Sequence, residues 1–172
     1  PARRRVLGGI SVPVDAKRIQ RIREAMTEHH WDGLICRLPE NVLFLSGWWP
    51  LSGTTWIVVS QEGQSCLIIP ACETAEAESD GITDYVAYEW AHLKAGDVGQ
   101  QVRDSLRSIC TRFGIAKGKI GIEENFEGIA PPLNLGEPCV PVRASRELVQ
   151  QSLPGAKLED ATDFINGMRL CK

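Results

Sequence analysis

Residues that favour strands gather in six short segments, and residues with helical spacing fill the segments around them. We predict strands at Leu34–Arg37, Thr54–Ser60, Ser65–Pro70, Asp84–Glu89, Lys119–Glu123 and Ala156–Glu159. We predict helices at Asp15–His30, Glu40–Ser46, Glu73–Glu78, Asp97–Phe113, Ser145–Ser152 and Ala161–Lys172. Because strands and helices are interspersed, the pattern indicates an α/β sheet covered by helices on both faces.

Local signals mark the ends of several elements. A four-residue segment containing Gly63 separates two strand-like runs and predicts a hairpin. Pro39 occupies a favourable first helical position, and Gly47 is a favourable helix stop. Asp15 and Asp97 are residues that cap helices. The helix after Asp97 has a core-facing stripe at Val98, Val102, Leu106, Ile109 and Phe113.

Composition is that of a globular domain. Of the 172 residues, 43% are hydrophobic and 24% are charged, and no apolar run approaches the roughly 18 residues of a membrane span. The net charge of −3 lacks the basic excess typical of nucleic-acid binders. No signal peptide is predicted, because Gly, Ser and Pro follow Arg3–Arg5 where an apolar segment is required. We therefore expect neither a membrane nor a nucleic-acid partner.

The six cysteines are scattered, and no two are separated by two to four residues. Zinc-binding and thioredoxin spacings are therefore absent from the sequence. We interpret all six as small buried hydrophobic residues in a reducing compartment, which predicts a cytoplasmic protein without disulfides.

No catalytic constellation is evident. His29 and His30 are adjacent, so on a helix their side chains point about 100° apart and do not share a metal ion as an i,i+4 pair does. Phosphate-binding glycine motifs and G-x-S-x-G are absent from the sequence. Five carboxylates would serve as metal ligands only if the fold gathered them, and we interpret them as solvated strand ends: Asp84, Glu123, Glu124, Asp160 and Asp163. We predict no catalytic residue, metal ligand or cofactor in this chain.

A loop with two tryptophans is the one candidate functional feature. Between two glycines, it contains Trp48, Trp49, Pro50, Leu51 and Ser52. Large aromatic residues that follow a helix stop either fold back onto the core or face a partner. Composition leaves both interpretations open.

Two motifs resemble the N-terminal domain of the creatinase/prolidase/aminopeptidase P family. After the helix at Arg18–His30, the segment Pro39-Glu40-Asn41-Val42-Leu43-Phe44-Leu45-Ser46-Gly47 is similar to the family's P-E-N-I-R-Y-L-T-G-F. Near the end of the chain, Leu158–Ala161 and Ile165–Lys172 are similar to the family's D-A … L-R-x-I-K. The resemblance spans Asp15 to Lys172.

The resemblance implies a mixed six-stranded sheet with flanking helices, akin to the ribonuclease H-like motif. It divides the chain into an extended arm at 1–14, the creatinase/prolidase N-terminal domain at 15–160, and the start of a linker helix at 161–172. In complete relatives, a following pita-bread catalytic domain holds two divalent metal ions (Mn, Co or Zn) and cleaves Xaa-Pro bonds or hydrolyses creatine. The Pro- and Gly-rich segment Asn125–Pro141 departs from the family pattern and is expected to be irregular.

The resemblance also implies a role for the tryptophan loop. In such enzymes the N-terminal domain supports homodimers and narrows access to the active site, which favours a partner-facing position for at least one of Trp48 and Trp49. Since residues 48–56 contain no Lys or Arg to hold a creatine carboxylate, we expect a peptidase parent.

Three hypotheses follow from these observations. The first is a non-catalytic domain of a metal-dependent Xaa-Pro peptidase. The second is a scaffold or pseudo-enzyme that binds protein partners, and the residues encoded after Lys172 separate it from the first. The third, a free-standing nuclease, rests on fold analogy alone and requires clustered carboxylates and a basic groove.

Overall fold

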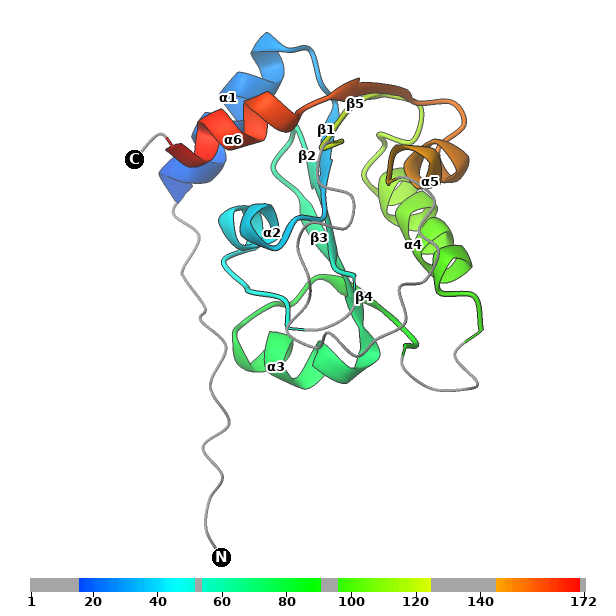
Figure 1. Ribbon diagram of the computed structural model, residues 1–172. Helices are drawn as coiled ribbons and strands as arrows, with labels where there is room; N and C mark the ends of the chain where they lie inside the picture. Colours follow the sequence, from blue (N-terminus) through cyan, green and yellow to red (C-terminus); the bar gives the residue numbers. More distant parts are fainter. Residues whose placement is uncertain (1–15, 52–53, 91–95, 125–144, 171–172) are drawn as a thin grey trace, which may run out of the picture.

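The computed structural model describes residues 16–51, 54–90, 96–124 and 145–170. In these residues, one sheet is packed between helices (Figure 1). Its strands are β1 (Gly33–Cys36), β2 (Trp56–Ser60), β3 (Ser65–Pro70), β4 (Tyr85–Tyr88), β5 (Lys119–Ile122) and β6 (Lys157–Asp160). The helices are α1 (Ala16–Glu28), α2 (Pro39–Ser46), α3 (Thr74–Ser79), α4 (Val98–Arg112), α5 (Ser145–Ser152) and α6 (Thr162–Leu170), and a 3₁₀ helix, η1 (Ala71–Glu73), precedes α3.

The sheet has six strands in the order β4-β3-β2-β1-β5-β6. Strand β2 is antiparallel to both β1 and β3, and the other neighbouring pairs are parallel, which confirms the predicted mixed sheet and hairpin. Every strand except β2 therefore runs in one direction. The carboxyl ends of those five strands meet the amino end of β2 along one edge, which we call the carboxyl edge.

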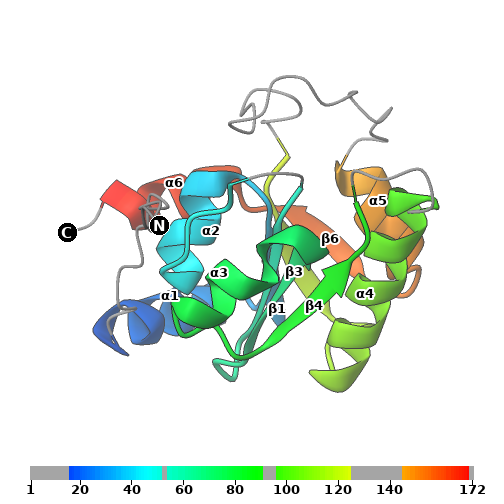
Figure 2. The same ribbon diagram turned by 90° about the horizontal axis from the view of Figure 1, so that it is seen from below.

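Two apolar clusters form the core, one on each face of the sheet. Helices α4 and α5 cover one face, and α1, α2, α3 and α6 cover the other (Figures 1 and 2). Successive side chains of a strand point to opposite faces. In β2, Trp56 and Val58 join the cluster under α4, whereas Ile57 and Val59 join the cluster under α2. Burial on both faces explains why the strands read as continuous apolar runs.

Helices α2 and α4 begin and end where the local signals predict. Pro39 is the first residue of α2, and Gly47 ends it with φ 79°. Asp97 caps α4 by accepting a hydrogen bond from the Gln100 N–H at 3.2 Å, and Gly114 follows that helix with φ 74°. Residues with a Cβ rarely adopt such a positive φ, so glycine is favoured at both stops.

Several boundaries differ from the prediction. Strand β2 begins at Trp56, two residues later than predicted, and the helical segment predicted at Glu73–Glu78 is divided into η1 and α3. Helix α6 begins at Thr162, one residue later than predicted, and packs onto the domain through the buried Ile165. Among the described residues, no helix combines the length and the apolar character that a membrane span needs. Several predicted features lie outside the described residues, among them the arm at 1–14, the cap Asp15 and the segment Asn125–Pro141.

Candidate functional site

The loop between α2 and β2 lies at the carboxyl edge of the sheet. It comprises residues 47–55, of which the structure describes 47–51 and 54–55. We call it the α2–β2 loop. It is placed there because α2 follows the carboxyl end of β1, and β2 starts from the same edge in the antiparallel direction. In open α/β sheets, ligands bind outside the carboxyl ends of the strands, so this edge is a natural place for a functional surface.

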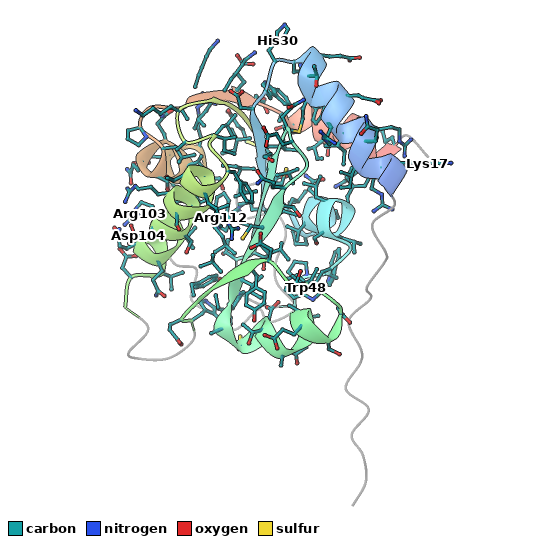
Figure 3. All side chains as sticks on the ribbon, turned by 180° about the vertical axis from the view of Figure 1, so that it is seen from behind. Lys17, His30, Trp48, Arg103, Asp104 and Arg112 are labelled. Atoms are coloured by element: carbon teal, nitrogen blue, oxygen red, sulfur yellow. The ribbon has the colours of Figure 1, made fainter. Side chains whose placement is uncertain are left out.

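The two tryptophans of the α2–β2 loop have different surroundings. Trp48 is 1% exposed, belongs to the cluster under α2 and lies between α2 and α3 (Figure 3). Trp49, Pro50 and Leu51 are half-buried, and Ser52 lies outside the described residues. Trp48 therefore belongs to the core, and Trp49 is the tryptophan of this loop whose side chain is partly accessible to a partner.

Two buried side chains hold the main chain of the loop. The Glu73 carboxylate, 3% exposed, accepts a hydrogen bond from the Leu51 N–H at 3.1 Å. The Tyr88 hydroxyl accepts from the Thr54 N–H at 2.9 Å and donates to the Thr54 carbonyl at 2.8 Å. Burial raises the pKa of Tyr88, which keeps the hydroxyl protonated and able to donate. Side chains from η1 and β4 therefore fix the backbone on both sides of residues 52–53.

Sequence reasoning did not find these two anchors. Glu73 is 22 residues from Leu51, and Tyr88 is 34 residues from Thr54, so no local spacing connects them. The one available signal is general: a buried Tyr or Glu requires a hydrogen-bond partner. That signal indicates a partner without indicating which one.

A second polar cluster surrounds Glu123, directly after β5. The carboxylate is 3% exposed and accepts hydrogen bonds from the N–H groups of Arg37 and Leu38, just before α2. It also accepts from the side-chain amide of Asn41, whose Oδ1 accepts from Arg169 of α6 at 2.9 Å. The interpretation of Glu123 as a solvated strand end is therefore wrong, because the fold places the amino end of α2 on its carboxylate.

The other predicted carboxylates do not converge on Glu123. Asp84 directly precedes β4, at the opposite edge of the sheet, and pairs with Arg112 at 2.9 Å. Of the remaining three, Glu124 pairs with Arg146, Asp160 accepts from the Thr162 N–H at the start of α6, and Asp163 is exposed. In the part of the chain that the structure describes, no group of three or more His, Cys, Asp or Glu could hold a metal ion.

The described cysteines fall into two groups by burial. Three are buried as predicted: Cys36, Cys66 and Cys110. Burial raises the pKa of Cys66 and of Cys110 to about 12, so both stay protonated at neutral pH. Cys72 is exposed, which corrects the prediction that all six are buried; it lies in η1, beyond the last buried residue of β3. Cys139 and Cys171 lie outside the described residues.

Comparison with known proteins decides the family. The family model of the Creatinase/Prolidase N-terminal domain matches residues 18–171. The chain belongs to the creatinase/prolidase N-terminal domain family. No curated protein matches the sequence.

Solved structures share the fold of this creatinase/prolidase N-terminal domain. A proline dipeptidase from Streptococcus pneumoniae is 17% identical with a TM-score of 0.61, and the alignment covers 90% of this chain and 98% of that chain. A Creatine_N superfamily domain of a dipeptidase from Streptococcus thermophilus is 19% identical with a TM-score of 0.60, covering 88% and 98%. A dipeptidase from Pyrococcus horikoshii is 19% identical with a TM-score of 0.58, covering 90% of this chain and 37% of that one. In the Pyrococcus protein, the shared fold is thus a minor part of a longer chain.

The two motifs that carry the sequence resemblance meet in the creatinase/prolidase N-terminal domain. Asn41 belongs to the first motif and Arg169 to the second, 128 residues away, and the hydrogen bond between them joins α2 to α6. The α2–β2 loop begins at Gly47, the last residue of the first motif. Helix α2 therefore connects the contact between the two motifs to the loop.

Proposed function

We propose that this domain is the non-catalytic N-terminal part of a metal-dependent Xaa-Pro dipeptidase or aminopeptidase. The family match supports this proposal, as do the names of similar structures, which include a proline dipeptidase and an Xaa-Pro aminopeptidase. In the parent enzyme, a pita-bread catalytic domain of the same polypeptide holds two divalent metal ions, Mn, Co or Zn. The N-terminal domain supports the homodimer.

In this proposal the α2–β2 loop narrows access to the active site. The observation that carries it is a loop whose main chain is fixed by Glu73 and Tyr88 while Trp49, Pro50 and Leu51 stay half-buried. A wall that limits substrate length must resist displacement, and the hydrogen bonds to the buried Glu73 and Tyr88 side chains provide that resistance. An uncharged, aromatic surface also suits the apolar ring of a proline residue.

Substrate-length selectivity of the full-length enzyme tests the access role. In Trp49→Ala, removal of the indole widens the entrance, so kcat/KM for longer Xaa-Pro peptides is expected to rise about tenfold relative to that for Xaa-Pro dipeptides. The matched control is Phe44→Ala, which removes a half-buried aromatic that packs under the Arg18 guanidinium of α1. The control should leave the ratio unchanged.

Two results would contradict the proposal. An unchanged selectivity ratio in Trp49→Ala rejects the access role. Absence of turnover by the full-length protein with added Mn²⁺, Co²⁺ or Zn²⁺ favours the scaffold or pseudo-enzyme alternative. Sedimentation of the full-length protein measures the expected homodimer independently of activity.

A further inference from the structure

Helix α6 is attached to the domain differently at its two ends. At its start, Ala161 and Ile165 are fully buried in the cluster under α2, and the Thr162 hydroxyl accepts a hydrogen bond from the Glu124 N–H at 3.0 Å. Apolar packing therefore holds the first turn firmly.

The last turn of α6 has much less apolar contact. Leu170 is 83% exposed, and nothing lies within 4 Å of the position that a Cβ on Gly167 would occupy. Met168 packs against the cluster but is only partly buried. Among the described residues, a hydrogen bond from Arg169 to Asn41 joins this turn to α2.

Asn41 is suited to this contact by its amide. Its side chain is fully buried, its nitrogen donates to Glu123, and its oxygen accepts from Arg169. A carboxylate in its place would accept from Arg169 without donating to Glu123, and an alkyl side chain would do neither. Glu123 in turn accepts hydrogen bonds from the N–H groups of Arg37 and Leu38. A continuous series of hydrogen bonds therefore links the Arg169 side chain to the backbone just before α2.

We propose that Arg169 is a positioning residue that fixes the last turn of α6 to α2. Helix α2 has eight residues, which is a length of about 12 Å, and the α2–β2 loop leaves from its other end. The short helix α2 then fixes the position of two parts of the chain: the last turn of α6 and the α2–β2 loop. This inference rests on the proposed function and deepens it. The α2–β2 loop can limit access to the active site only if it keeps a fixed position relative to the catalytic domain, and the contact between α6 and α2 provides that fixed position.

Native-state hydrogen exchange on the 172-residue chain tests the positioning role. Arg169→Met keeps an unbranched apolar stem and removes the hydrogen bond, so amides 167–170 should exchange at least about tenfold faster while those of α4 are unchanged. Arg169→Lys retains a cationic donor and should restore part of the protection. Arg112→Met is the matched control, because Arg112 also lies in the last turn of its helix and pairs with Asp84. It should leave α6 unchanged.

Asn41→Asp separates the attachment of α6 from general stability. The new carboxylate accepts from Arg169 but repels Glu123, so the variant should be less stable than wild type at pH 7. Amides 167–170 should remain protected relative to α4. Uniformly faster exchange in Arg169→Met, or equal loss of α6 protection in Asn41→Asp and Arg169→Met, would overturn the positioning role. Because exchange requires no peptide substrate, failure here is distinct from failure of the selectivity test.

Discussion

Helices α4 and α2 lie on opposite faces of the sheet and begin in different ways. Helix α4 has 15 residues, and the side chain of the adjacent Asp97 caps it. Helix α2 has eight residues, and Leu38 at its N-cap makes no side-chain capping bond. The Leu38 N–H is bonded instead by Glu123, 85 residues further along the chain. One helix carries its own start signal, and the other depends on a strand end elsewhere in the fold.

The difference follows from length. Isolated helices shorter than about 12–15 residues are marginal in water, so a helix as short as α2 depends on tertiary contacts. Helix α4 is long enough to present an apolar stripe, in which Val102, Leu106 and Ile109 are buried. Helix α2 buries Asn41 together with Val42 and Leu45, and the polar member of that set makes the long-range bonds. Short elements beside a candidate site are thus held by contacts that local sequence does not display.

The largest effects are expected from the tryptophans. Trp48→Ala, at the end of α2, should lower the free energy of unfolding by about 3–5 kcal/mol, as should Trp56→Ala on the α4 face, because both side chains are 1% exposed. Trp49→Ala should cost about 1 kcal/mol or less, because that side chain is half-buried. Urea unfolding of the three variants measures the order. Equal losses at positions 48 and 49 would contradict the different surroundings of the two residues.

Substitutions at the starts of α2 and α4 should lower the free energy of unfolding by smaller and different amounts. Glu123→Ala leaves the N–H groups of Arg37 and Leu38 and the amide of Asn41 without their acceptor, and we expect a loss of about 3 kcal/mol. Asp97→Ala should cost about 1 kcal/mol, because water can replace the lost cap at an exposed helix end. Thermal and urea unfolding should agree on this difference. Equivalent costs would mean that α2 does not depend on its distant acceptor.

Glu159 on β6 is also held by distant residues, and its contribution to the free energy of unfolding should depend on pH. Hydrogen bonds from the Trp31 indole, and then from Lys119 and Lys157, lower the pKa of Glu159 to about 2. Because the pKa is lower in the folded state than the usual value near 4.3, the contribution is present above about pH 4.5 and is lost as pH falls towards 2. Glu159→Gln should therefore be less stable than wild type at pH 7, and the gap should close over that window.

Urea unfolding at several pH values measures this gap. The control is Glu62→Gln in the exposed hairpin turn, which should follow the wild-type dependence. A gap for Glu159→Gln that stays constant from pH 7 to about pH 2 would rule out the assigned cause.

The smallest effect is expected at the last turn of α4. Arg112 and Asp84 form an ion pair whose side chains are 50% and 44% exposed. Arg112→Met should change the free energy of unfolding by about 0–1 kcal/mol, and the change should shrink further in about 0.5 M NaCl. Comparing unfolding at low and high salt measures it. If Arg112→Met lowered the free energy of unfolding as much as Glu123→Ala, the exposed ion pair would stabilise this fold as strongly as the buried hydrogen bonds of Glu123.

The local sequence alone predicted the elements of this protein. The spacing of Val102, Leu106 and Ile109 predicted α4, Pro39 and Gly47 predicted the two ends of α2, and the apolar runs around Gly63 predicted the hairpin. Helical and strand periods, proline geometry and positive-φ glycines act over a few residues, so they are readable in one dimension. The family motifs then supplied the mixed sheet, which the structure and the family match confirm.

Only the tertiary structure decided what surrounds the candidate loop. Trp48 and Trp49 are adjacent and identical in type, and packing between α2 and α3 buries one more deeply than the other. The sequence alone indicates that Glu123 is a solvated carboxylate at a strand end, but in the fold it accepts hydrogen bonds from the start of α2. Asn41 and Arg169 are 128 residues apart in the sequence and form a hydrogen bond in the structure. Burial and hydrogen-bond partners at such separations depend on how the whole chain packs, and no local spacing encodes them.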